Sequence, residues 1–263
     1  MRTRRQRLGQ HFLADPEIAA AIIGVLPAEP ARVLEIGPGE GALTALLAER
    51  FPRVVAVELD VRLAAALRRR TGASPGVEVI QGDALTLSSE RFAAEPPWQA
   101  VGNLPYSVAT PIIRRLLTWQ GVLVQLVVMV QLEVAERLAA PPGAAARGLL
   151  TVERELRADC EPLFVVPPRS FRPPPKVTSA VLRLALRPAS RAAGLERRVL
   201  ALASAGFTQR RKKLANALAA QAPPPAVASA LEAIGVDPAA RAQDLDLAAW
   251  CALAGRLTAG TGA

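Results

Sequence analysis

Histidine and cysteine are scarce in this chain of 263 residues, which has one histidine, His11, and two cysteines, Cys160 and Cys251. A serine or cysteine nucleophile with a histidine base would have to use His11, and nothing around it resembles such a site. The same scarcity excludes a cluster of histidine and cysteine ligands around a metal ion. Because the two cysteines are far apart and match no redox spacing, we expect them to be reduced, buried thiols.

Long apolar runs are also missing. The longest, residues 121–130, contains Gln125 and has about the length of a buried strand, which is too short to span a bilayer. The basic residues 1–7 lead into no apolar signal-peptide core. We therefore expect a cytoplasmic protein without a membrane partner.

Acidic residues are fewer than basic ones, with 23 Asp and Glu against 32 Lys and Arg and a net charge of +9. Nucleic acid is the usual partner of such a surplus. A GC-rich genome would explain arginine in place of lysine, but not the excess of bases over acids. The basic residues gather in two groups, for which a solvated surface is the alternative explanation. These groups are Arg2, Arg4, Arg5 and Arg7, and then Arg210, Arg211, Lys212 and Lys213.

Strand and helix patterns alternate along the first part of the chain. Apolar strands are expected at residues 32–36, 54–57, 77–80, 100–103 and 122–130. Helices are expected at residues 15–26, 42–50, 61–70, 108–119, 131–139 and 149–156. This alternation is typical of an α/β fold with a doubly wound, mostly parallel Rossmann-like sheet.

Two late strands are expected at residues 160–166 and 177–186. The proline-rich segment between them, residues 167–176, should be stiff and extended and should present Phe171, for which packing in the core between the prolines is the alternative. After Pro188 the pattern changes to short helices rich in alanine and leucine, without strands. We therefore expect two domains, residues 1–187 and a small all-α domain of residues 188–263.

Residues 37–41 form a glycine-rich turn after the first strand and fit the loose dinucleotide fingerprint, with Glu58 placed to bind a ribose. An NAD-dependent oxidoreductase is therefore one interpretation. Against it, Glu35 would point a carboxylate toward a pyrophosphate, and Pro38 removes a backbone donor. A cofactor with an ammonium group and no phosphate, such as S-adenosylmethionine, tolerates that charge. Glu35, Glu58 and Asp83 at successive strand ends then describe a methionine, a ribose and a base site.

Residues 103–106 follow the fourth strand, which Pro105 should end. Asn103 and Tyr106 are then at the edge where open α/β sheets bind ligands. The amide oxygen of Asn103 and the carbonyl of Leu104 can accept hydrogen bonds from the exocyclic amine of adenine. The ring of Tyr106 can stack on the base. A plain strand exit with a capping asparagine and a packed tyrosine is the alternative.

Taken in order, these motifs resemble the ribosomal RNA adenine dimethyltransferases, in particular the bacterial small-subunit enzymes known for kasugamycin sensitivity. The resemblance covers nearly the whole chain and is carried by residues 9–13, 35–39, 58–60, 82–84, 102–106, 171–177 and 207–212. The chain departs from the family pattern at His11, where asparagine is usual, and at Ser107 and Leu132.

The resemblance implies transfer of methyl groups from S-adenosylmethionine to N6 of two adjacent adenines. They lie in the 3′-terminal hairpin loop of 16S rRNA, in the small ribosomal subunit or its precursor. It also implies a monomer with a role in small-subunit biogenesis. Residues 1–187 would be the methyltransferase domain with a basic N-terminal arm, and residues 188–263 an RNA-binding domain.

The implied site has three parts and no metal. The catalytic residues are Asn103, Leu104, Pro105 and Tyr106, and the cofactor-binding residues are His11, Leu13, Glu35, Gly37, Gly39, Glu58, Asp83, Ala84 and Asn103. The substrate-binding residues are Tyr106 and Phe171, which would stack on a flipped adenine, and Arg210, Arg211, Lys212 and Lys213. Alternatives are an adenine methyltransferase acting on large-subunit rRNA or DNA, a mainly noncatalytic ribosome-assembly factor, and the NAD-dependent oxidoreductase.

Overall fold

The computed structural model describes residues 11–72, 74–189 and 193–259. The basic group of Arg2, Arg4, Arg5 and Arg7 lies outside the described residues. The chain divides into two compact units, residues 1–135 with 158–188, and residues 136–157 with 189–263. The predicted boundary after residue 187 lies one residue from one of these divisions, whereas residues 136–157 group with the C-terminal helices. The helix at residues 149–155 buries apolar side chains in the core of the second unit. The order of elements in the sequence does not show this contact.

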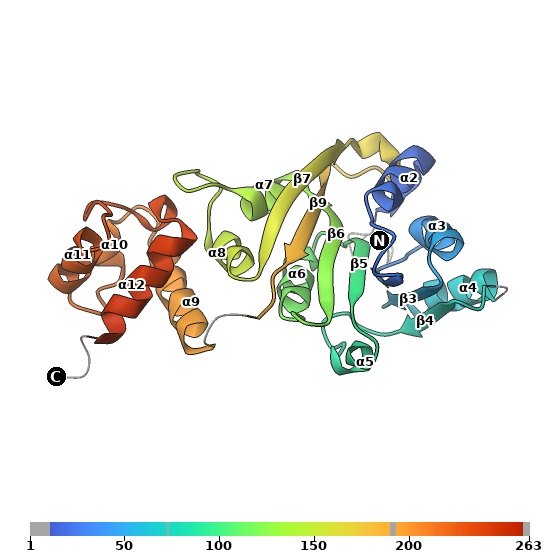
Figure 1. Ribbon diagram of the computed structural model, residues 1–263. Helices are drawn as coiled ribbons and strands as arrows, with labels where there is room; N and C mark the ends of the chain where they lie inside the picture. The colour runs from blue at the N-terminus through green and yellow to red at the C-terminus, as the bar shows by residue number, and fades with distance from the viewer. Residues whose placement is uncertain (1–10, 73, 190–192, 260–263) are drawn as a thin grey trace. The chain divides into compact units, whose positions relative to one another are not determined.

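The first unit is built on a seven-stranded sheet in the order β4-β3-β2-β5-β6-β9-β7 (Figure 1). Its parallel part consists of β2 (Arg32–Ile36), β3 (Arg53–Glu58), β4 (Val77–Gln81), β5 (Trp98–Asn103) and β6 (Leu123–Gln131). β9 (Ser179–Leu186) runs antiparallel to both β6 and β7 (Ala158–Val166). The predicted Rossmann-like α/β fold is confirmed. Because β2 pairs with β3 on one side and β5 on the other, their carboxyl ends form a topological switch point.

Helices connect these strands as the alternating pattern predicts. They are α2 (Pro16–Gly24), α3 (Ala42–Arg50), α4 (Val61–Thr71), α5 (Glu90–Ala93), α6 (Ala109–Leu117) and α7 (Leu132–Ala139). α2 begins as expected, with the Asp15 side chain accepting from the N–H groups of Glu17 and Ile18 and with proline at the first position. Ile22 of α2 and Leu47 of α3 are buried in one core cluster, and the two helices lie side by side (Figure 1).

The proline-rich segment is not simply extended. It contains a short 3₁₀ helix, η1 (Pro168–Ser170), followed by β8 (Phe171–Arg172), which pairs antiparallel with β1 (Phe12–Leu13). The prediction that this segment presents Phe171 is wrong. The side chain is 1% exposed and packs in the core cluster that contains Leu13 and Val166, because strand pairing turns it toward the interior.

The second unit is helical. Its elements are α8 (Leu149–Glu155), α9 (Ala193–Thr208), α10 (Leu214–Ala217), α11 (Pro224–Glu232), η2 (Ala242–Asp244) and α12 (Leu247–Ala259). No strand occurs in its described residues, as predicted for residues 188–263. Trp250 is fully buried in the core cluster of this unit, which also contains Val152 of α8 and Leu156, the residue just after α8.

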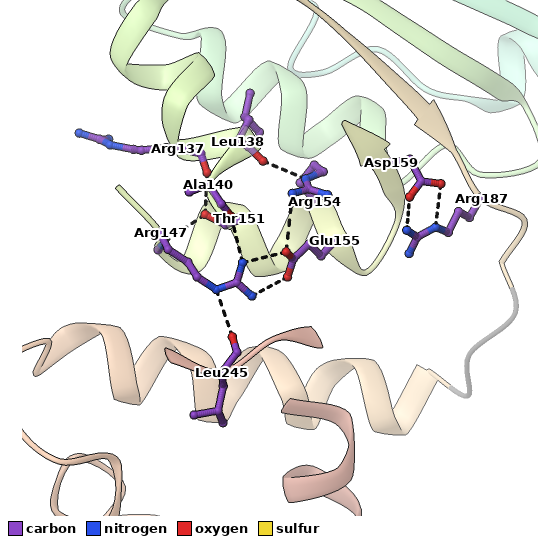
Figure 2. Close-up of polar contacts among 11 residues, drawn as sticks. Arg137, Leu138, Ala140, Arg147, Thr151, Arg154, Glu155, Asp159, Arg187 and Leu245 are labelled. Carbon is purple, nitrogen blue, oxygen red and sulfur yellow. Dashed lines mark hydrogen bonds and ion pairs between the residues drawn. The ribbon is translucent and has the colours of Figure 1, made fainter. Parts of the chain in front are cut away.

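A buried arginine ties the parts of this second unit together (Figure 2). Arg147, whose side chain is 0% exposed, donates two hydrogen bonds of 2.8 and 2.7 Å to the carboxylate of Glu155. Its Nη1 also donates to the carbonyl of Ala140, and its Nε to the carbonyl of Leu245, both at 3.1 Å. Residues 98 positions apart are thereby joined, which explains why residues 136–157 belong to this unit.

Two sequence-based exclusions can be compared with the described residues. Among residues 11–72, 74–189 and 193–259, no helix is both long and apolar enough to cross a bilayer. Within the same ranges, no group of His, Cys, Asp and Glu side chains is arranged to hold a metal ion. Cys160 and Cys251 form no disulfide, but both are partly exposed, so the prediction that they are buried is wrong.

Candidate active site

A cleft opens at the carboxyl ends of β2 to β5, at the switch point of the sheet. It is lined by the turns after these strands and by β1. All residues predicted to bind the cofactor or to carry catalysis line it: His11, Leu13, Glu35, Gly37, Gly39, Glu58, Asp83, Ala84, Asn103, Leu104, Pro105 and Tyr106. The parallel strands β2 to β5 bring most of them together because these strands end at the same edge of the sheet, and the segment with β1 adds His11 and Leu13.

The three glycines of the turn after β2 donate their N–H groups to protein oxygens. Gly37 donates its N–H to the carbonyl of Val57 (2.9 Å), Gly39 to Oε2 of Glu58 (3.0 Å), and Gly41 to the carbonyl of Pro38 (2.8 Å). A pyrophosphate needs such N–H groups at a helix N-terminus. Because the N–H groups of the three glycines are already occupied and Pro38 has none, the turn is poorly suited to a pyrophosphate.

Backbone conformation and close packing explain why glycine stands at residue 39. Its φ of 58° lies in the left-handed region, and a Cβ there would come within 2.8 Å of the Phe12 ring. The close approach brings Phe12 of β1 against the turn. The N-terminal segment and the glycine turn are therefore two walls of one cleft.

Glu35, the fourth residue of β2, places a carboxyl group in a dry environment. Its side chain is 1% exposed, and Oε2 accepts a hydrogen bond of 2.6 Å from the hydroxyl of Thr44. Burial raises the pKa of Glu35 from 4.5 to about 7, the bond from Thr44 opposes the rise, and the nearby Glu58 adds to it. A cationic group bound beside Glu35 would oppose the rise in pKa, because it favours the ionised carboxylate.

Two further carboxylates stand at the ends of β3 and β4. Glu58 is 4% exposed and accepts from the N–H groups of Gly39 (3.0 Å) and Asp60 (2.8 Å). Asp83 is half-buried and accepts from the N–H of Leu85 at 2.9 Å. A carboxylate has about four acceptor positions, so each can also accept from a ligand. Three acidic groups in one cleft suit a cationic ligand that carries hydroxyl and amine donors.

The orientation of the Asn103 amide follows from its partner. Nδ2 donates to the backbone carbonyl of His11 at 3.0 Å, across 92 positions of sequence. Since a carbonyl oxygen can only accept, the Nδ2 atom of Asn103 must face His11. The Oδ1 atom of Asn103, which lines the cleft, is then available as an acceptor. Leu104 contributes a second carbonyl at the same strand end, while its N–H is held by the carbonyl of Met129 at 3.1 Å.

Tyr106 has an aromatic neighbour and a polar one. Its ring centroid lies 5.4 Å from that of His11, and its hydroxyl lies 2.6 Å from Oγ of Ser179. His11 is itself held, with Nδ1 at 2.7 Å from the carbonyl of Pro173. Burial raises the pKa of Tyr106 while the bond with Ser179 opposes the rise, so the side chain is a neutral phenol at physiological pH. Ser179 and Thr44 could not be identified as site residues from the sequence, because each is a single small polar residue in an apolar run.

Two groups of predicted substrate residues do not line the cleft. Phe171 is buried in the core, so it cannot stack on a base as predicted. The basic cluster, residues 210–213, is exposed between α9 and α10 of the second unit. Arg210 is anchored there, donating to the carbonyl of Ala145 at 2.6 Å and lying 5.7 Å above the ring of Phe207.

The chain is similar to proteins of one family along almost its whole length. The sequence model of the ribosomal RNA adenine dimethylase family matches residues 1–259. Ribosomal RNA small subunit methyltransferase A of Synechococcus sp. (strain JA-3-3Ab) is 42% identical over 259 residues, covering 95% of this chain and 91% of the relative. The protein of the same name from Geobacter metallireducens is 41% identical over 219 residues, covering 81% of this chain and 80% of its own.

Solved structures support the same fold. The 23S rRNA methyltransferase ErmE is 31% identical with a TM-score of 0.73, covering 94% of this chain and 99% of its own. A dimethyladenosine transferase from Plasmodium falciparum is 24% identical with a TM-score of 0.75, covering 92% of this chain and 96% of its own. The similarity to the second structure concerns the fold alone.

Proposed function

The chain belongs to the ribosomal RNA adenine dimethylase family, and on that premise we propose that its substrate is 16S rRNA in the small ribosomal subunit or its precursor. It is an S-adenosylmethionine-dependent rRNA adenine dimethyltransferase. The proposed targets are two adjacent adenines in the 3′-terminal hairpin loop, each dimethylated at N6. The names of the relatives at 42% and 41% identity support the small subunit. We also propose that the protein is a monomer and that it acts in the cytoplasm during small-subunit biogenesis.

The charges of the cleft suit the cofactor. When bound, S-adenosylmethionine supplies an electrophilic methyl group on a positively charged sulfur. We assign Glu35 to its ammonium group, Glu58 to its ribose hydroxyls and Asp83 to its adenine amine. The occupied N–H groups of Gly37, Gly39 and Gly41 support a cofactor without phosphate. His11, Leu13, Gly37, Gly39 and Ala84 are proposed to complete the walls of this site.

The orientation of Asn103 is the observation that carries the proposed mechanism. Its Nδ2 is committed to the His11 carbonyl, so Oδ1 can accept one hydrogen of the target amine. The carbonyl of Leu104 would accept the other, and Pro105 holds the turn between the strand end and Tyr106. Accepting both hydrogens makes the N6 nitrogen more pyramidal and exposes its lone pair. Tyr106 would stack on the base, worth about 1–3 kcal/mol in single-strand binders.

Catalysis in this proposal is mainly positioning. Good alignment of two reactants can supply on the order of 7–11 kcal/mol of the barrier without a metal or a strong base. The basic cluster, residues 210–213, is proposed to hold RNA phosphates outside the cleft, where its exposure suits contact with a large partner. A mainly noncatalytic role in ribosome assembly is disfavoured by the intact acceptor and stacking residues at 103–106.

Large-subunit rRNA is the second candidate substrate. The likeness to ErmE, a 23S rRNA methyltransferase, at 31% identity over 94% of the chain favours it. The small-subunit relatives are more similar in sequence, at 42% and 41% identity, and we therefore prefer 16S rRNA. Mapping the modified adenines distinguishes the two.

Asn103→Ala tests the proposed mechanism, with Asn216→Ala, at an exposed position of α10, as the control. Loss of one polar contact made mainly in the transition state typically costs about 3 kcal/mol, or a hundredfold or more in rate. We expect single-turnover methylation of precursor small subunits to fall by that factor, with RNA and cofactor affinity retained. Near-normal turnover would reduce Asn103 to a strand-end cap. A parallel loss of cofactor affinity and turnover would place it in the cofactor site instead.

A further inference from the structure

We propose that Ser179 is a positioning residue for methyl transfer that acts through Tyr106. The inference rests on the proposed function, in which the ring of Tyr106 is the platform for the target base. Ser179 belongs to none of the motifs that mark the site and is 73 positions away from Tyr106 in sequence. Its hydroxyl nevertheless lies 2.6 Å from the phenol oxygen.

The backbone of Ser179 is rigidly held. It is the first residue of β9, and its Cα pairs with Gln131 of β6 on one side and Val166 of β7 on the other. The side chain is 0% exposed. A short side chain on a strand with neighbours on both edges has little freedom, so its Oγ is a fixed point in the sheet.

Tyr106, by contrast, is in a turn, between the end of β5 and the start of α6. Turn residues move more easily than strand residues. The phenol oxygen is bonded to Ser179, and the ring faces that of His11 at 5.4 Å with an interplanar angle of 31°. These two contacts act on different parts of the side chain and fix the plane of the ring before a base arrives. Such preorganisation reduces the ordering that substrate binding must supply.

The burial of Ser179 and Tyr106 decides whether the Ser179→Ala variant can distinguish a positioning role from a purely structural one. Ser179→Ala removes the hydroxyl from a fully buried place, so no polar atom of residue 179 is left unsatisfied. The Tyr106 side chain is half-buried and lines the cleft. Loss of its hydrogen bond to Ser179 should cost about 1 kcal/mol of folding stability, and the main effect should be on the orientation of the ring.

The chain has a single tyrosine, which gives the proposal a direct spectroscopic readout. Protein labelled with ¹³C at the phenol carbon gives one tyrosine resonance, and it reports only on Tyr106. We expect Ser179→Ala to shift this resonance and Ser179→Thr, which keeps the hydroxyl, to restore it. Ser229→Ala, at an exposed position of α11, is the matched control and should leave the resonance unchanged.

A double-mutant cycle with Tyr106→Phe tests the functional part. Single-turnover methylation of precursor small subunits should fall about three- to tenfold in Ser179→Ala and in Tyr106→Phe, the range of one net hydrogen bond. The double variant should be no slower than either single variant, because both remove the same bond. Ser179→Thr should recover the rate, and cofactor affinity should be unchanged in all variants.

Two outcomes would overturn the inference. The first is a double variant whose loss of methylation rate is the product of the two single losses. The second is a Ser179→Ala protein that has the normal methylation rate and an unshifted Tyr106 resonance. Tyr106→Ala distinguishes this failure from failure of the proposed function. If Tyr106→Ala abolishes transfer while Ser179→Ala does not slow it, only the role of Ser179 is wrong. If Tyr106→Ala is as active as the unmodified protein, the stacking role in the proposed function is wrong.

Discussion

Glu35→Gln separates the destabilising effect of a buried carboxyl group from its use in the cofactor site. The native protein raises the pKa of Glu35 to about 7, whereas the ordinary value is 4.5. Between these two pH values the native state binds this proton more tightly than the unfolded chain does. The free energy of unfolding therefore falls as pH rises through this window, and the full loss is present above about pH 7.

The size of the effect follows from the two pKa values. Each pH unit of difference corresponds to about 1.4 kcal/mol, so the interval from 4.5 to about 7 amounts to about 3 kcal/mol. Glutamine has nearly the same shape, does not ionise, and can still accept the hydrogen bond from Thr44. The variant should be more stable than the unmodified protein by up to about 3 kcal/mol at pH 8, and by little at pH 4.5.

Urea unfolding of the cofactor-free protein at both pH values measures this difference, and calorimetry gives it as roughly 2–4 °C in Tm for each kcal/mol. Glu49→Gln, at an exposed position of α3, is the control and should change neither value. The same variant should lose most of the Tm increase that S-adenosylhomocysteine produces, because the proposed partner of its ammonium group is gone. An equal gain at both pH values, or no gain, would refute the pKa argument. Undiminished ligand stabilisation would remove Glu35 from the ammonium site.

Two further predictions concern the second unit. Arg147→Met should lower the free energy of unfolding of this unit by about 3–5 kcal/mol in urea, because the carboxylate of Glu155 loses a buried partner. A decrease below about 1 kcal/mol would contradict the stabilising role given to the ion pair of Arg147 and Glu155. Neutralising residues 210–213 together should weaken RNA binding and flatten the slope of log K against log salt concentration by about 0.7–0.9 for each lost phosphate contact. An unchanged slope would make the cluster an ordinary solvated surface.

The sheet and the cleft were predictable from sequence because they depend on local patterns. Each parallel strand is an apolar run that ends in a turn, and parallel strands bring their carboxyl ends to the same edge. Three acidic side chains and the residues 103–106 could therefore be placed in one site without knowing any long-range contact. Glu35 and Pro38 already argued against the dinucleotide interpretation, and the structure adds that the N–H groups of Gly37, Gly39 and Gly41 donate to protein oxygens.

Two wrong predictions, and one residue that the sequence analysis missed, depend on contacts between residues far apart in sequence. Phe171 looked exposed among prolines, but pairing of β8 with β1 turns it into the core. Residues 136–157 looked continuous with the first domain, but Arg147 joins them to Leu245. Ser179 looked like one residue of an apolar strand, and only the fold brings it to Tyr106. Local periodicity contains none of this information.

Mapping methylated adenines in rRNA tests the central claim most directly. Small subunits and large subunits from cells that lack this gene would be incubated separately with the purified protein and labelled S-adenosylmethionine. Mass spectrometry of nuclease fragments would then locate the methyl groups. The account predicts N6,N6-dimethyladenosine at two adjacent positions in the 3′-terminal hairpin loop of 16S rRNA, and no modification of 23S rRNA. Methyl groups on 23S rRNA alone, or on neither RNA, would contradict it.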